Sequence, residues 1–313
     1  MDPTAFLTDY TLRTVAFGTM ALGATCGLLG AFAVLRGQSL VGDAIGHAAL
    51  PGVALAFMLT GSRSPLVLAL GAGVTGWLAT RFVARAESSA AVRTDSALAT
   101  ALSAFFGVGL VLLTFLQRRP DAQQAGLDRY LFGQAATLLE ADVLRIALFG
   151  LVALATVLAC WKPFRLLIFD RPFGEALGFR MHRYDVLLTL LLVGAIVMGL
   201  EAVGVVLVSA LVVAPGAAAR QWTDRLGPMA ALAAGFGALS GFGGALVSAS
   251  AAHLPTGPVI VLVASVIALV SLLFAPSRGV IPRLVRGRRR TLDGPAFDAA
   301  AFGDRAFEPA PRP

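Results

Sequence analysis

The chain has 313 residues, of which 57% are hydrophobic and only 14% are charged. Because soluble domains carry about 25% charged residues, this composition excludes an ordinary soluble protein and favours one that crosses a membrane several times. The formal net charge of +7 does not indicate nucleic-acid binding. Much of the basic excess lies near the ends of apolar segments and in a C-terminal arginine cluster, where membrane topology and lipid headgroups account for it.

Apolar runs long enough to form membrane helices follow one another along the chain. Nine are predicted, at approximately 14–35, 41–60, 65–84, 96–117, 142–161, 185–200, 202–219, 228–252 and 257–275. The first run is too long for a cleavable signal peptide and lacks its basic start, so we interpret it as a true span. The sixth and seventh runs are short and would merge in an eight-helix alternative, but Gly199, Glu201 and Gly204 favour a turn between them.

The distribution of basic residues supports nine helices. With the N-terminus outside, only six of the 25 Lys and Arg residues fall on the outer side and the other 19 fall inside, as the positive-inside rule requires. Merging the sixth and seventh helices would move the arginine-rich C-terminus outside. We therefore predict an all-α polytopic membrane protein, with a transmembrane domain at 1–276 and a basic, disordered cytoplasmic tail at 277–313.

The second apolar run contains an acid and a base near its start. Asp43 and His47 are four residues apart, which places them on one face of a helix, one turn apart. A carboxylate and an imidazole on one face can share a metal ion or a proton, whereas a carboxylate at the helix mouth can also be simply solvated. Gly42 and Gly46 have the small-residue spacing that lets another backbone approach, and Pro51 removes a backbone donor and favours a kink.

The stretch LRGQSLVGDAIGHAALPG, residues 35–52, resembles the signature of membrane permeases of bacterial manganese, zinc and iron ABC importers. Residues 208–219 and 254–262 resemble two further stretches of that family, so the resemblance runs from about residue 14 to 276. It implies a type II-like ABC importer permease in the bacterial cytoplasmic membrane, with Asp43 and His47 in the path of the transported ion. Two copies, or one copy and a related permease, would form this path without a permanently bound cofactor.

The predicted inner loop 162–184 has the pattern of a short helix. Pro172 suits its first turn, Glu175 suits the N-terminal dipole and Gly178 suits a C-terminal cap. This loop resembles the coupling motif by which such permeases contact a cytoplasmic ATPase, and the resemblance assigns this contact to Asp170, Glu175, Ala176 and Gly178. The alternative is an ordinary solvated connection.

The predicted outer loop 118–141 contains the apolar stretch LDRYLFG at 127–133, which also resembles a piece of the permease family. One interpretation is an interfacial helix anchored by Tyr130 and Phe132. The other is a docking surface for an extracytoplasmic substrate-binding protein. The residues favour neither.

Other polar and sulfur-containing residues are weaker candidates. Glu201 lies in apolar surroundings and either lines the path or ends the sixth helix, whereas His182 and His253 lie near turns and are expected to be interface residues. Cys26 and Cys160 are expected to be packing residues rather than a disulfide or metal pair.

The chain cannot hydrolyse ATP through a phosphate-binding loop, since its only lysine, Lys162, is followed by Pro163. We therefore predict a transport subunit that is not an enzyme and that depends on a separate ATPase. Three alternatives remain: a permease for siderophores or vitamins, an ion-coupled secondary transporter in which Asp43 and Glu201 carry protons, and an intramembrane enzyme using Asp43 and His47. The last would need more convergent polar residues than the spans contain.

Overall fold

The structure is a computed structural model, and it describes residues 9–38, 40–62, 64–88, 93–117, 138–250 and 254–282. Every regular element in these ranges is a helix. The long helices are α2 (Tyr10–Leu35), α3 (Val41–Thr60), α4 (Pro65–Ser88), α5 (Thr94–Gln117), α7 (Glu140–Ala159), α10 (Met181–Val203), α11 (Val205–Trp222), α12 (Leu226–Ser250) and α13 (Thr256–Phe274). Two short helices, α8 (Trp161–Phe169) and α9 (Arg171–Ala176), lie between α7 and α10.

These long helices match the nine predicted runs one to one, which confirms the fold class. Eight of those found in the described ranges are long and apolar enough to cross a membrane, and α11 is the further long helix, of 18 residues. The predicted break between the sixth and seventh runs lies at Gly204. Its φ of 89° is a backbone conformation that residues other than glycine rarely adopt. Helix α10 therefore ends here and α11 begins.

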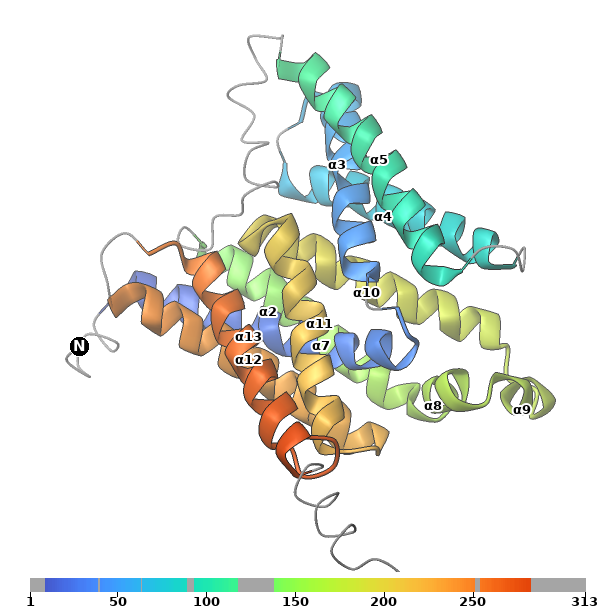
Figure 1. The fold of residues 1–313 in the computed structure, drawn as a ribbon. Helices are drawn as coiled ribbons and strands as arrows, with labels where there is room; N and C mark the ends of the chain where they lie inside the picture. Colours follow the sequence, from blue (N-terminus) through green and yellow to red (C-terminus); the bar gives the residue numbers. More distant parts are fainter. Residues whose placement is uncertain are drawn as a thin grey trace, which may run out of the picture.

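Helix α2 lies at the centre of the fold and packs against α7, α10, α11 and α12 (Figure 1). Glycine makes this packing possible: a Cβ added at Gly23 would lie 2.1 Å from the backbone oxygen of Gly237, and one at Gly30 would lie 1.8 Å from that of Val212. Backbones in direct contact are typical of membrane helix interfaces. The hydroxyl of Thr19 also donates to the carbonyl of Gly241, at 3.0 Å.

A second group consists of α3, α4 and α5, which stand together beside the α2 bundle in Figure 1. Helix α3 contacts both other members of this group, and a Cβ added at Gly52 of α3 would lie 2.1 Å from the backbone oxygen of Gly71 in α4. Helix α3 also reaches the first bundle, because Gly42 packs against Ser209 of α11, with an added Cβ 3.1 Å from the Ser209 Cα. The close backbone approach predicted at Gly42 is thus confirmed.

The described chain ends shortly after α13. The hydroxyl of Ser277 donates to the carbonyl of Trp222, at 2.8 Å, and Arg278 forms an ion pair with Asp224, at 2.6 Å. Ser277 and Arg278 therefore hold the segment after α13 against the end of α11 and the connection to α12. The arginine cluster further along the tail lies outside the described residues, and the disordered tail stays a prediction.

Candidate functional site

The first turns of α3 place Asp43 and His47 on one face. The N-terminal residue before the helix, Leu40, gives no side-chain cap, and Asp43 is the acid of the first turn, where a carboxylate is stabilised by the helix dipole. Along this part of the helix Asp43, His47 and Leu50 are partly exposed, whereas the residues between them are buried. The predicted shared face therefore exists, and it is the open face of the part of the helix that is otherwise packed, from Val41 to Ala54.

The imidazole of His47 is held by an aromatic neighbour. Its ring meets that of Phe106 in α5 edge to face, with 4.8 Å between the centroids and 75° between the planes. Its Nδ1 atom is buried and has no hydrogen-bond partner among the described residues. Because an unpaired buried polar atom costs about 1–3 kcal/mol, this nitrogen is suited to a ligand that the chain itself does not supply.

Pro51 adds a third donor to the same turn. It lies inside α3 and has no N–H, so the backbone carbonyl four residues earlier, that of His47, loses its helical partner. The predicted consequence of Pro51 was a kink; the chemical consequence is a carbonyl oxygen next to the imidazole and one turn from Asp43. A carboxylate, an imidazole and a backbone carbonyl without its helical N–H partner thus lie within the first two turns of α3.

Glu201 lies in another environment. It lines a small cavity together with residues near the start of α7 and the end of α10, namely Leu138, Asp142, Arg145, Ile146, Met198 and Ala202. None of these belongs to α3. Within the described part of the chain, no three His, Cys, Asp or Glu side chains are grouped as a metal site. The structure thus pairs Asp43 with His47 and leaves a role of Glu201 in the path as a prediction.

The short helix predicted in the inner loop is α9. Asp170 caps its start by accepting a hydrogen bond from the N–H of Phe173, at 3.0 Å. Gly178 follows its end with a φ of 85°, and its N–H and that of Phe179 donate to the carbonyls of Glu175 and Gly174. This is the Schellman arrangement that terminates a helix at glycine, so the predicted C-terminal cap is confirmed.

The predicted role of Glu175 at the N-terminal dipole is wrong. The helix is only six residues long, and Glu175 lies in its last turn beside Ala176. Its carboxylate instead forms an ion pair with Arg171, at 3.2 Å. Glu175 is the fifth residue of a helix that begins at Arg171, so its carboxylate lies beyond the first turn, where the N-terminal dipole acts.

Two exposed apolar side chains at α9, those of Phe173 and Leu177, were not among the predicted site residues. Phe173 is 52% exposed and Leu177 is 56% exposed, whereas Gly174 is buried against Met181 of α10, where an added Cβ would lie 2.0 Å from the Met181 Cε. Exposed apolar residues that are four apart in a polar loop are the signal that could have identified this surface. They give α9 a face suited to a protein partner.

Several further candidates have simple positions. Cys26 is buried within α2 and Cys160 lies at the junction of α7 and α8, both as free thiols, which confirms their predicted positions. His182 is exposed at the start of α10. Tyr130, Phe132 and His253 lie outside the described residues, so the predicted outer docking surface stays a prediction.

The fold and this site define a polytopic α-helical membrane protein with an acid and imidazole face on one membrane helix and a short, exposed helix between two spans. The chain belongs to the ABC 3 transport family, whose model matches residues 8–275. The main prediction from the sequence, a permease of this type, is confirmed.

Known relatives cover most of the chain. It is 48% identical to the zinc transport system membrane protein TroC of Treponema pallidum, over 91% of this chain and 95% of that protein. It is 42% identical to the manganese transport system membrane protein MntC of Bacillus subtilis, over 88% of this chain but 64% of that protein. Among solved structures, PsaBC from Streptococcus pneumoniae in complex with Fab matches with a TM-score of 0.77 and 28% identity, over 91% of this chain and 98% of that one.

Proposed function

We propose that this chain is the membrane permease subunit of an ABC importer that moves divalent transition-metal ions, manganese, zinc or iron, into the bacterial cytoplasm. The observation that carries the proposal is the open face of α3, where Asp43 lies one turn from a His47 whose buried Nδ1 has no partner in the described chain. The family match and the metals named for its relatives support the same class of cargo.

The donor types fit this cargo. Carboxylate and carbonyl oxygens attract divalent cations in general, and one imidazole nitrogen favours transition metals over calcium and magnesium. Thiolates are absent from this face, since Cys26 and Cys160 lie on other helices. A site without thiolates and with few ligands suits an ion that must leave again, rather than a tight structural zinc site.

A second permease copy would complete the ligand set. One α3 helix offers two ligating side chains, and no larger group of metal-binding side chains occurs in the described ranges. Two α3 helices related by a two-fold axis would face each other with two carboxylates and two imidazoles. A related permease with the same residues would serve equally, so the proposal covers both a homodimer and a heterodimer.

Energy and delivery would come from other subunits. The chain has no phosphate-binding loop, as its only lysine precedes a proline, so cytoplasmic ATPase subunits would bind α9 through Phe173 and Leu177. An extracytoplasmic metal-binding protein would deliver the ion. ATP binding would then shift the permease between outward-facing and inward-facing states, and the α3 face would hold the ion between them.

The test is uptake of radiolabelled metal into vesicles that contain the permease and its ATPase. We expect uptake to require ATP and not a proton gradient. At matched expression, Asp43→Ala and His47→Ala should each lower uptake at least about 10-fold. His182→Ala is the matched control, because that imidazole is exposed at the start of α10, and it should transport normally. Uptake driven by a proton gradient without ATPase, or normal uptake by both α3 variants, would contradict the proposal.

A further inference from the structure

The end of α2 is connected to the start of α10 by an ion pair. Arg36, directly after the last residue of α2, forms it with Asp185 in the first turns of α10. Both side chains are largely shielded, with 21% and 23% exposure. A pair in such a position loses less to solvent screening than a surface pair, so it ties the two helix ends together.

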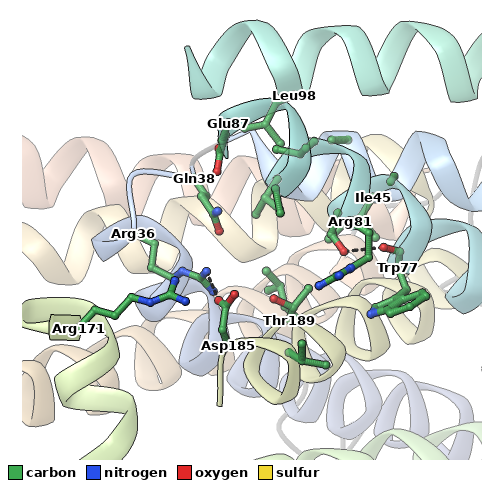
Figure 2. A pocket seen from close by; sticks show the side chains of 18 residues that line it. Arg36, Gln38, Ile45, Trp77, Arg81, Glu87, Leu98, Arg171, Asp185 and Thr189 are labelled. Carbon is green, nitrogen blue, oxygen red and sulfur yellow. Dashed lines mark hydrogen bonds and ion pairs between the residues drawn. The ribbon is translucent and has the colours of Figure 1, made fainter. Parts of the chain in front are cut away.

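This ion pair lies in the wall of a cavity that α3 also lines. The cavity has a volume of about 190 Å³, and Val41, Ala44 and Ile45 of α3 contribute to it beside Arg36 and Asp185. Arg171, the first residue of α9, lines it as well, and in Figure 2 the side chains of Arg36 and Arg171 both point toward Asp185. The cavity thus brings together the ion pair of Arg36 with Asp185 and the Arg171 side chain, whose own ion pair is with Glu175.

An aromatic chain connects the same elements through the core. The ring of Phe179, just after α9, meets that of Tyr184 in α10 at 6.2 Å between centroids. Tyr184 meets Phe164 of α8 at 6.4 Å, and Phe164 meets Phe32 of α2 at 6.0 Å. Phe32 and Phe164 are fully buried. Because closely packed interiors transmit displacement rather than absorb it, these rings form a stiff connection.

The aromatic series ends on α2, the helix that directly precedes the one holding the proposed metal face. Phe32 lies one turn before Arg36, and Gly37, with a φ of 70°, closes α2 sharply. The N–H groups of Gly37 and Gln38 donate back to the carbonyls of Val34 and Ala33, and α3 begins at Val41. The N–H of Val41 donates to the carbonyl of Gln38, at 3.3 Å, so hydrogen bonds join the end of α2 to the first turn of α3, which carries Asp43.

We propose that the Arg36–Asp185 ion pair and the rings of Phe179, Tyr184, Phe164 and Phe32 link α9 mechanically to the Asp43–His47 face. Tyr184 and Asp185 are then the positioning residues through which ATP-driven movement of α9 reaches the metal. This inference rests on the proposed function and names the internal route by which the partner ATPase would act on it. Chains of packed side chains and ion pairs are one physical means by which such coupling is carried between distant sites.

The experiment measures metal ions transported per ATP hydrolysed in vesicles containing the permease and its ATPase. We expect Arg36→Gln and Asp185→Asn each to lower this ratio about 5-fold or more while ATP hydrolysis continues. The double variant should be no worse than either single variant, because both remove the same interaction. Asp224→Asn with Arg278→Gln is the control, since that ion pair joins the segment after α13 to the connection between α11 and α12, and its ratio should stay at the wild-type value.

The ring contacts are tested with separate variants, so that the link can still be tested if the ion-pair variants fail to fold. Tyr184→Phe keeps the ring and should transport normally, whereas Tyr184→Leu keeps an apolar side chain without the ring edges and should lower the ratio at an unchanged melting temperature. A normal ratio in Tyr184→Leu, or independent and additive losses in the ion-pair cycle, would overturn the link while leaving the proposed function intact. Failure of the wild-type protein to take up metal with ATP would overturn both.

Discussion

Helices α2 and α3 are consecutive in the chain and both are rich in glycine, yet they use it differently. The glycines of α2 press against backbone on several sides, at Gly237, Ala233 and Val212. On α3, Gly42 and Gly52 fix the helix against α11 and α4, while the Asp43 and His47 face is left partly open. The difference is that α2 is enclosed by neighbouring helices, whereas α3 keeps the face on which the proposed metal site lies partly open.

The same comparison explains where polar groups are satisfied. The hydroxyl of Thr19 on α2 is paired with carbonyls of its own helix and with Gly241 of α12. The Nδ1 of His47 on α3 is buried without a partner in the described chain. Because buried polar groups are normally paired, this unpaired nitrogen is one of the observations on which the proposed metal site rests.

The largest effect is expected from crowding the α2 interface. A Cβ at Gly237 would lie 2.0 Å from the backbone oxygen of Gly23, which neither helix can relieve without moving apart. Gly237→Val should cost about 3 kcal/mol or more and leave little folded protein. The yield of monodisperse detergent-solubilised protein and its melting temperature measure this.

Gly235→Val is the matched control for this change. It lies two residues earlier in α12, where nothing is within 4 Å of an added Cβ. Its yield and melting temperature should match those of the wild-type protein. Equal behaviour of the two valine variants would show that α2 is not held by close backbone contact.

A second, smaller effect is expected on α3, where stability and function should separate. Pro51→Ala restores an N–H that can pair with the carbonyl of His47, and it removes a residue unfavourable inside helices. We expect the melting temperature to stay the same or rise, and metal uptake to fall about 10-fold. Unchanged uptake with a raised melting temperature would show that the carbonyl takes no part in the path.

The smallest effect concerns a glycine used for its conformation alone. Gly178 after α9 has a φ of 85° and no neighbour within 4 Å of an added Cβ, unlike the glycines of α2. Gly178→Val should therefore reduce stimulated ATP hydrolysis several-fold by distorting the end of α9. Gly178→Asn should be nearly normal, because asparagine tolerates this conformation. Equal loss in both variants would assign the effect to the side chain instead of the backbone.

The sequence predicted the helices well because each long apolar run must satisfy its backbone internally in a membrane. It also predicted the shared face of Asp43 and His47 and the caps of α9, since both follow from local spacing. Contacts between distant residues could not be predicted from the sequence, because they depend on how the helices pack. Examples are the pairing of Arg36 with Asp185, the ring of Phe106 against His47, and the position of Glu201 beside α7. Glu175 was misplaced because α9 begins at Arg171, which leaves this carboxylate in the last turn of the helix and not in the first.

The central claim, that the α3 face holds the transported ion, is tested most directly by the nitrogen coupling of bound Mn²⁺ in pulsed electron paramagnetic resonance of the purified permease. The chain has only three histidines, so a histidine nitrogen signal can be assigned by substitution. The account predicts nitrogen coupling in the wild-type protein and in His182→Ala, and its loss in His47→Ala. The same coupling in His47→Ala as in the wild-type protein would show that the metal is held elsewhere.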